Sequence, residues 1–113
     1  MPFIDSKITT TVSEEKREAI KKRLGEEIRI LGKTESYLMV GFEDEYDLYF
    51  AGDKVEKGAF VSVKVLGSVN PDACDKMTGA ICQILLEELD IPGDKVYVSY
   101  QGIRDWGYNG RNF

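Results

Sequence analysis

The sequence predicts an α+β fold in which a βαβ unit occurs twice, forming a four-stranded mixed sheet with two helices on one face. Three observations favour this fold: a weak internal repeat, two helix patterns with end signals, and four strand-like segments. In the repeat, Pro2-Phe3-Ile4 matches Ala59-Phe60-Val61, 57 positions later. Because self-similarity at a fixed offset indicates a repeated structural unit, we expect pseudo-repeats over about 2–57 and 58–113 within one domain spanning residues 1–113.

The first half of the chain is typical of strand, helix and strand. We expect a strand at Phe3–Ile8. Ser13 then suits the start of a helix, because its side-chain oxygen can accept a free backbone N–H, and Gly32 suits the position just after the helix. A second strand is expected at Tyr37–Phe42. The apolar stripe of the helix is formed by Ile20, Leu24, Ile28 and Leu31.

The second half repeats this order. A strand is expected at Ala59–Leu66 and another at Val96–Gln101. Between them, Asn70 is a favourable N-cap and Pro71 fits the first helical position, where its missing N–H costs nothing. Two helical crossovers imply parallel strand pairs. The second helix ends before Pro92 and Gly93, and its apolar stripe is formed by Ala73, Met77, Ile81, Ile84, Leu85 and Leu89.

The sheet is expected to meet other copies of the chain. The two helices cover one face of the sheet, yet this single helix layer cannot cover all three of the apolar side chains of Phe3, Phe60 and Val63. Leu48–Phe50 and the tail Ile103–Phe113 resemble short edge strands that pair between subunits. A two-layer monomer is the alternative.

Composition excludes several classes of function. The formal net charge of −5 argues against a nucleic-acid partner, which would favour a basic face. No apolar run approaches the ~20 residues of a membrane span, so no membrane partner is expected. No signal-peptide pattern is visible, so we expect a cytoplasmic protein, with secretion by a route without a signal peptide as the alternative.

The complete absence of histidine narrows the chemistry. It removes Ser-His-Asp and Cys-His catalysis and every His-ligated metal site. Cys74 and Cys82 lie about 12 Å apart on one helix, too far for a disulfide. Gly32-Lys33-Thr34 lacks the order of a phosphate loop, and the acidic run Glu43–Asp47 lacks the spacing of a calcium loop. We therefore expect no metal and no cofactor.

Pro2 is the most informative residue of the chain. If Met1 is removed, Pro2 exposes a secondary amine at the mouth of the sheet. Burial and a nearby cation would both lower the pKa of that amine from about 8, and a neutral amine is a base at pH 7. If Met1 is retained, the same nitrogen is an amide and cannot take a proton.

Other residues permit two interpretations each. Lys33 either complements the C-terminal dipole of the first helix or serves a site. Tyr97 is expected on the same face as Ser99, either as a half-buried strand residue or as a pocket residue. The tail carries aromatic residues that either pack or wall a pocket for a flat ligand, namely Trp106, Tyr108 and Phe113.

The chain resembles the macrophage migration inhibitory factor family of the tautomerase superfamily over almost its whole length. The resemblance rests on order and spacing more than on any one motif. It is carried by Met1-Pro2-Phe3-Ile4, Gly32-Lys33, Gly67, Leu85-Leu86-Glu87-Glu88-Leu89 with Ile91, Asp94-Lys95-Val96-Tyr97-Val98, and Gly107-Tyr108-Asn109 with Phe113.

This resemblance implies a homotrimer and a keto–enol tautomerase of phenylpyruvate-like α-keto acids that needs no cofactor. By position, Pro2 would be the base, and Lys33 would bind the substrate carboxylate and help to keep the proline neutral. Tyr97 would come from a neighbouring subunit. The other residues expected to bind a small aromatic α-keto acid are Phe3, Tyr37, Leu66, Ser99, Trp106, Tyr108 and Phe113.

The chain departs from the family pattern at several positions. Gly58 and Val61 stand where the best-known member has a Cys-x-x-Cys pair, so no thiol–disulfide activity is expected. Ser99 replaces an asparagine, Tyr108 replaces a rim tryptophan, and Trp106 replaces a smaller residue, so the preferred substrate is left open. The resemblance also permits a cytokine-like protein that binds a host receptor. A third alternative is a ferredoxin-like module that binds a small ligand.

Overall fold

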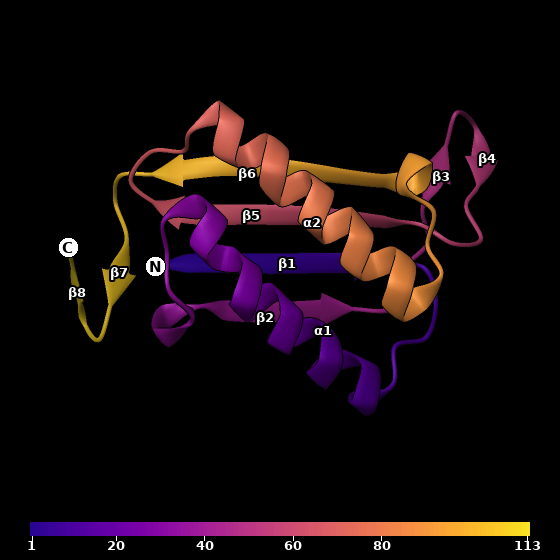
Figure 1. The fold of residues 1–113 in the computed structure, drawn as a ribbon, viewed down its shortest axis with the longest axis horizontal. Coiled ribbons are helices and arrows are strands. Elements are labelled where there is room, and N and C mark those ends of the chain that lie inside the picture. The colour runs from indigo at the N-terminus through magenta and orange to yellow at the C-terminus, as the bar shows by residue number, and fades with distance from the viewer.

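The computed structural model describes residues 1–113 and contains one main sheet with two long helices (Figure 1). The sheet has four strands in the order β2-β1-β5-β6. Their bounds are β1 Pro2–Ile8, β2 Met39–Glu43, β5 Ala59–Leu66 and β6 Val96–Ile103.

Strand pairing confirms the duplicated βαβ fold. β1 runs parallel to β2, with Phe3 opposite Met39, and β5 runs parallel to β6, with Phe60 opposite Tyr97. The two units join through the antiparallel pair β1–β5, in which Pro2 lies opposite Val65. The sheet is therefore mixed, as predicted.

Both helices begin at the predicted caps. α1 (Glu14–Glu27) starts after Ser13, whose hydroxyl oxygen accepts the Lys16 N–H. α2 (Pro71–Leu89) starts after Asn70, whose side chain accepts the Ala73 N–H. The last two residues of the first apolar stripe, Ile28 and Leu31, lie beyond the end of α1, in a 3₁₀ turn, η1 (Ile28–Leu31).

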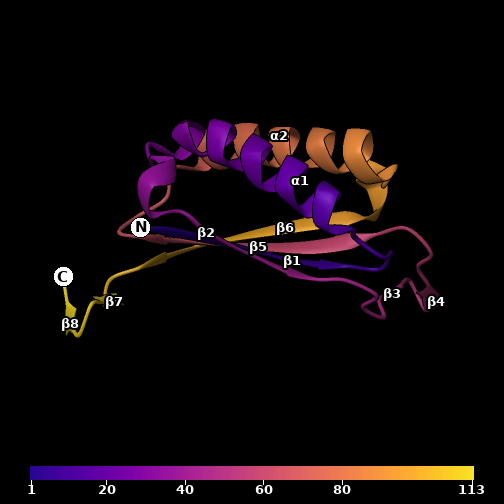
Figure 2. The same cartoon turned by 90° about the horizontal axis from the view of Figure 1, so that it is seen from below.

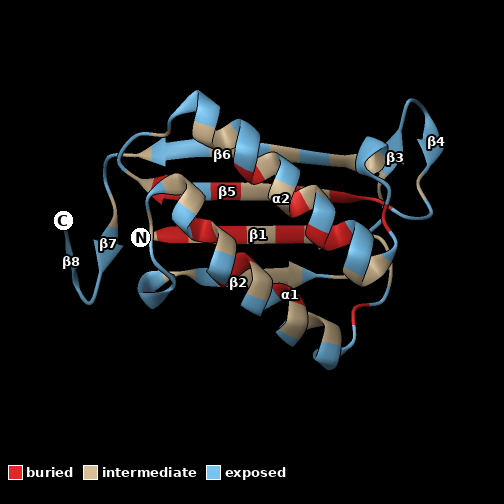
Figure 3. Cartoon of the chain, viewed as in Figure 1, coloured by how far each residue is buried: buried red, intermediate tan, exposed pale blue.

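The core lies between the helices and one face of the sheet (Figure 2). Burial alternates along β1, and the two middle strands are the most buried (Figure 3). Ile4, Ile81 and Met77 are at most 1% exposed. Burial of such side chains contributes about 1.5–3 kcal/mol each. The strands next to the core are therefore held firmly in register.

The open face of the sheet differs from the expectation of a second apolar surface. Val63 is 1% exposed and belongs to the core, because it has the same parity along β5 as the other helix-facing residues. Phe3 and Phe60 are half-buried on the open face. That face also carries Lys7, which pairs with Asp5 at 3.3 Å. The open face is thus partly charged.

The predicted second strand starts too early. Glu35–Tyr37 form a 3₁₀ turn, η2, in which the Leu38 N–H donates to the Glu35 carbonyl at 3.0 Å. Tyr37 therefore precedes the strand. A third short turn, η3 (Gly93–Lys95), leads into β6, which runs two residues beyond the predicted end.

Two short hairpins project from opposite ends of the sheet (Figure 1). One pairs β3 (Tyr49–Phe50) with β4 (Asp53–Lys54), and the other pairs β7 (Gly107–Tyr108) with β8 (Arg111–Asn112). Short strands were predicted in both segments; their pairing between subunits remains a prediction. Neither α1 nor α2 has the length and apolar character of a membrane span.

Candidate functional site

Pro2 lies at the end of the sheet where the N-terminus and the β7–β8 hairpin come together (Figure 1). It is buried and opens β1 beside Val65 of β5. The carbonyl oxygen of Met1 accepts the Leu66 N–H at 3.0 Å, which extends the β1–β5 ladder by one bond. The N-terminal residue is therefore fixed to the end of β5.

The electrostatics at this end favour an uncharged amine. Burial, and to a smaller extent the positive charge of Lys33, lowers the pKa of the Met1 amino group from its ordinary value of 8.0. Both effects penalise the protonated form, since burial removes its hydration and the ammonium repels it.

Lys33 reaches this place from the end of the first helical segment. Gly32 has a φ of +72° and turns the chain out of η1. The Lys33 ammonium then donates to the Leu66 carbonyl oxygen at 3.2 Å. Leu66 consequently contacts the N-terminal residue with its N–H and Lys33 with its carbonyl. The structure thus brings Lys33 and Leu66 to the end of the sheet where Pro2 begins β1; their roles remain predictions.

Three predicted aromatic residues form one exposed cluster at the same end. Tyr37 meets Tyr108 edge to face, with ring centroids 5.9 Å apart. Tyr108 stacks on Phe113 at 6.2 Å with an interplanar angle of 4°. We call Tyr37, Tyr108 and Phe113 the aromatic rim. Trp106 is half-buried behind it, and its carbonyl accepts the Phe113 N–H at 3.1 Å.

The remaining predicted residues lie elsewhere on the same chain. Tyr97 is opposite Phe60, five positions from Val65, which is about 16 Å along a strand. Ser99 is opposite Ser62 in the middle of the open face. A methyl group at Gly41 would lie 3.3 Å from the Phe3 ring, so Phe3 lies close against β2. One chain therefore does not bring Tyr97 or Ser99 to the rim, whereas Phe3 follows Pro2 directly and lies opposite Met39.

Tyr97 belongs to a second aromatic cluster that sequence reasoning missed. Its ring lies 5.6 Å from Phe50 and 6.3 Å from Phe60, and we call these three residues the far-end cluster. Part of this cluster could have been predicted, because parallel pairing of the strands at Ala59–Leu66 and Val96–Gln101 places Phe60 beside Tyr97. The position of Phe50 depends on the β3–β4 hairpin, which alternation alone does not predict.

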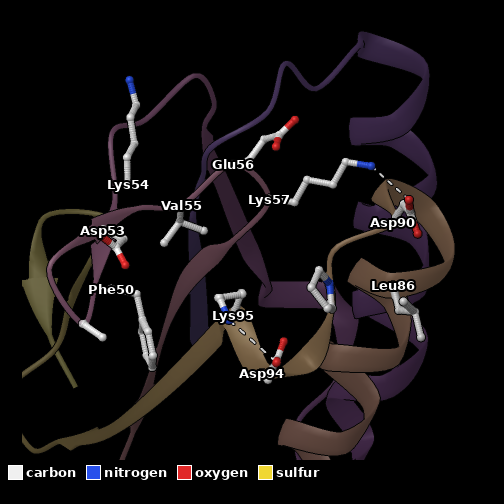
Figure 4. Close-up of a pocket in the computed structure, with 12 residues that line it drawn as sticks. Phe50, Asp53, Lys54, Val55, Glu56, Lys57, Leu86, Asp90, Asp94 and Lys95 are labelled. Atoms are coloured by element: carbon white, nitrogen blue, oxygen red, sulfur yellow. Dashed lines mark hydrogen bonds and ion pairs between the residues drawn. The ribbon is translucent and has the colours of Figure 1, made fainter.

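The largest hollow of the surface lies at the far end, between the β3–β4 hairpin and the end of α2 (Figure 4). Its charged walls are largely paired, with Lys57 on Asp90 at 2.9 Å and Lys95 on Asp94 at 3.7 Å. None of the residues predicted for the site lines it. The Pro2 end is therefore the better candidate, because convergent polar groups and a lowered pKa mark functional sites.

Comparisons with known proteins agree with this geometry. The family model described as macrophage migration inhibitory factor (MIF) matches residues 1–113. The macrophage migration inhibitory factor of Xenopus laevis is 27% identical over 84 residues, which are 73% of this chain and 72% of that protein. The structure of Leishmania major MIF2 is 31% identical with a TM-score of 0.93, covering 100% of this chain and 97% of its own. The MIF-like protein of Entamoeba histolytica has a TM-score of 0.88 at 22% identity, covering 99% and 98%.

Proposed function

Since the chain belongs to the macrophage migration inhibitory factor family, we propose that it is a keto–enol tautomerase of phenylpyruvate-like α-keto acids whose general base is Pro2 after removal of Met1. The observation that carries this proposal is that burial and the charge of Lys33 lower the pKa of the Met1 amine, one residue before Pro2, which opens β1 in a buried position. In support, Pt0534, which has the same fold with a TM-score of 0.84 at 16% identity, is described as inactivated by 2-oxo-3-pentynoate.

The proposed reaction needs one base and one cation. The neutral Pro2 amine takes a proton from the carbon next to the keto group. The electron pair of that C–H bond forms the C=C bond of the enol, while the C=O π pair moves to the keto oxygen, which takes a proton from water. Reprotonation of the carbon by Pro2 or water reverses the step. Lys33 binds the substrate carboxylate, and its charge disfavours a protonated Pro2.

Loss of Met1 also changes the hydrogen bonding of Leu66. Its N–H now donates to the Met1 carbonyl, and removal of that residue frees the donor beside Pro2. A buried or half-buried N–H without a partner is costly, so the freed group is suited to a substrate oxygen. We assign Leu66 this role together with the apolar contact of its side chain. The aromatic rim would hold the ring of the substrate, with Trp106 behind it.

We further propose that the protein works as a homotrimer. The aromatic rim and the far-end cluster are exposed at opposite ends of the sheet, with Phe113 67% and Tyr97 59% exposed. Head-to-tail contact between unlike patches forms a ring when the rotation from one subunit to the next closes, and such a ring would bring the Tyr97 and Ser99 of one subunit towards the Pro2 of the next. A protein of the same fold, with a TM-score of 0.85 at 19% identity, is described as a symmetric trimer.

The test is an enol–keto assay on protein whose intact mass shows loss of methionine. We expect Pro2→Gly to lower the rate about 10²–10⁴-fold, the usual contribution of a general base. Pro92→Gly, in an exposed loop at the far end, removes a proline without touching Pro2 and serves as the control. Equal rates for wild type and Pro2→Gly would refute the base role, and a monomer in sedimentation would refute the trimer.

A further inference from the structure

The chain leaves β5 by a turn that crosses directly over Gly102 of β6. Gly67 has a φ of +96° and its N–H donates to the Ile103 carbonyl at 2.8 Å. A Cβ placed on Gly102 would lie 2.3 Å from the Gly67 carbonyl oxygen and 3.1 Å from the Ser68 Cα. Both contacts are to backbone, which cannot rotate away as a side chain can.

Gly102 is needed for space and not for its backbone conformation. Its φ is not among the positive values of the chain, so an L-residue could adopt the same backbone. By alternation along β6 a side chain there would point to the same side as Tyr100, towards the turn that leads to α2. In contrast, a Cβ on Gly79 of α2 would meet nothing within 4 Å.

The peptide that a side chain at this position would push is joined to the candidate site. Gly67 follows Leu66, whose carbonyl holds the Lys33 ammonium at 3.2 Å and whose N–H holds the Met1 carbonyl at 3.0 Å. Relief of a 2.3 Å contact to an ordinary distance needs a backbone shift approaching 1 Å. Such a shift moves the carbonyl that holds the Lys33 ammonium and the Leu66 N–H that loss of Met1 frees beside Pro2.

We propose that Gly102 is a positioning residue: its missing side chain admits the Gly67–Ser68 turn, which sets the Leu66 peptide groups and through them the separation of Lys33 from the N-terminal amine. The inference rests on the proposed function. Gly102 also lies opposite Val65, which in turn lies opposite Pro2, but the nearest atoms that its side chain would meet belong to the turn.

Replacement of Gly102 by alanine should lower kcat/KM and raise the pKa of the Pro2 amine. Because a misplacement of about 1 Å can cost on the order of 10²-fold, we expect Gly102→Ala to lower kcat/KM by about 10–10²-fold. Lys33 is the one charged group whose field lowers the pKa of the Met1 amine, and we expect it to act in the same way on the Pro2 amine once Met1 is removed. Displacement of Lys33 should therefore raise the pKa of the Pro2 amine and move the acid limb of the pH–rate profile to higher pH.

The experiment compares Gly102→Ala with two controls in protein that lacks Met1. Gly79→Ala adds the same methyl group in open space. Ile81→Val loses one buried methyl group from the core and so matches a general loss of stability. Both controls should keep the wild-type pH profile. In the Lys33→Met background, Gly102→Ala should cost less than in wild type, since groups that act together are not additive.

A wild-type pH profile and rate in folded Gly102→Ala would overturn the proposal, as would full additivity with Lys33→Met. If Gly102→Ala does not fold, wild-type protein decides by NMR. The amides of Leu66, Gly67 and Gly102 should then follow the titration of the Pro2 amine, while that of Gly58 should not, and no response at Gly102 would refute the coupling. If wild-type protein has no tautomerase activity, the proposed function fails. The positioning role of Gly102 is then still tested by comparing the pKa of the Pro2 amine in wild type and Gly102→Ala.

Discussion

Tyr100 gives the sharpest test of the packing between β6 and α2. Its hydroxyl shares a 2.8 Å hydrogen bond with the Thr78 hydroxyl, and burial raises the pKa of Tyr100 to about 12. The unfolded chain ionises at the ordinary value near 10 and binds fewer protons between those two values. Stability is therefore fully present below pH ~10 and is lost as pH rises towards ~12.

The magnitude follows from the two pKa values. At pH 11 about nine-tenths of unfolded chains but only about a tenth of folded chains carry the phenolate, which corresponds to about 1.4 kcal/mol. The hydrogen bond itself contributes about 1 kcal/mol. The Tyr100→Phe variant should thus be about 1 kcal/mol less stable than wild type at pH 8, and as stable or slightly more stable at pH 11.

Urea unfolding at a fixed protein concentration measures this difference. With a slope of about 2 kcal/mol per M, the variant midpoint should lie about 0.5 M below wild type at pH 8, and the gap should close at pH 11. The lysines and exposed tyrosines are common to both proteins, so their titration cancels. A gap of the same size and sign at both pH values would refute the argument that Tyr100 is buried as a neutral phenol.

Three further outcomes follow. Lys33→Met should raise the pKa of the Pro2 amine and lower kcat/KM at pH 6–7 by about tenfold or more; an unchanged acid limb of the pH–rate profile would exclude Lys33 as the charge that repels the protonated amine. Tyr108→Ala should raise KM roughly tenfold with a smaller change in kcat, because it removes the ring that joins Tyr37 and Phe113 into the rim and with it a stacking contact to the substrate ring worth about 0.5–1.5 kcal/mol; an unchanged KM for phenylpyruvate would mean that the rim does not hold substrate. Met77→Ala should destabilise by about 2–5 kcal/mol, since Met77 is 0% exposed; a loss under 1 kcal/mol in urea unfolding would contradict its place in the core.

The fold could be predicted because local signals and the global arrangement agree. Ser13 and Asn70 cap the helices as their side-chain chemistry predicts, and the apolar stripes meet the helix-facing residues of the strands. Predictions were wrong where tertiary context decides. Tyr37 has strand propensity, yet it closes a 3₁₀ turn. Val63 was counted with Phe3 and Phe60 among residues that one helix layer could not all cover, because the register was not known, and the pairing of β1 with β5 places it opposite Ile4 of the core.

The candidate site was only partly predictable for a similar reason. The order and spacing of residues along the chain point to Pro2, Lys33 and Tyr108 as candidate site residues, and the fold brings the segments that carry them to one end of the sheet. The contribution of Leu66 through its backbone N–H and carbonyl could not be read from its side chain. Gly102 gives no sequence signal either, because its importance depends on the turn that crosses it.

The order β2-β1-β5-β6 leaves the outer margins of β2 and β6 without a neighbour inside the chain. Rows of unsatisfied peptide groups are templates for adding further strands, including those of misfolded chains. In the proposed homotrimer, neighbouring copies would cover these margins, and a newly synthesised copy would be most prone to aggregate before they do. The apparent stability of such an assembly should increase with protein concentration, so dilution alone should destabilise it.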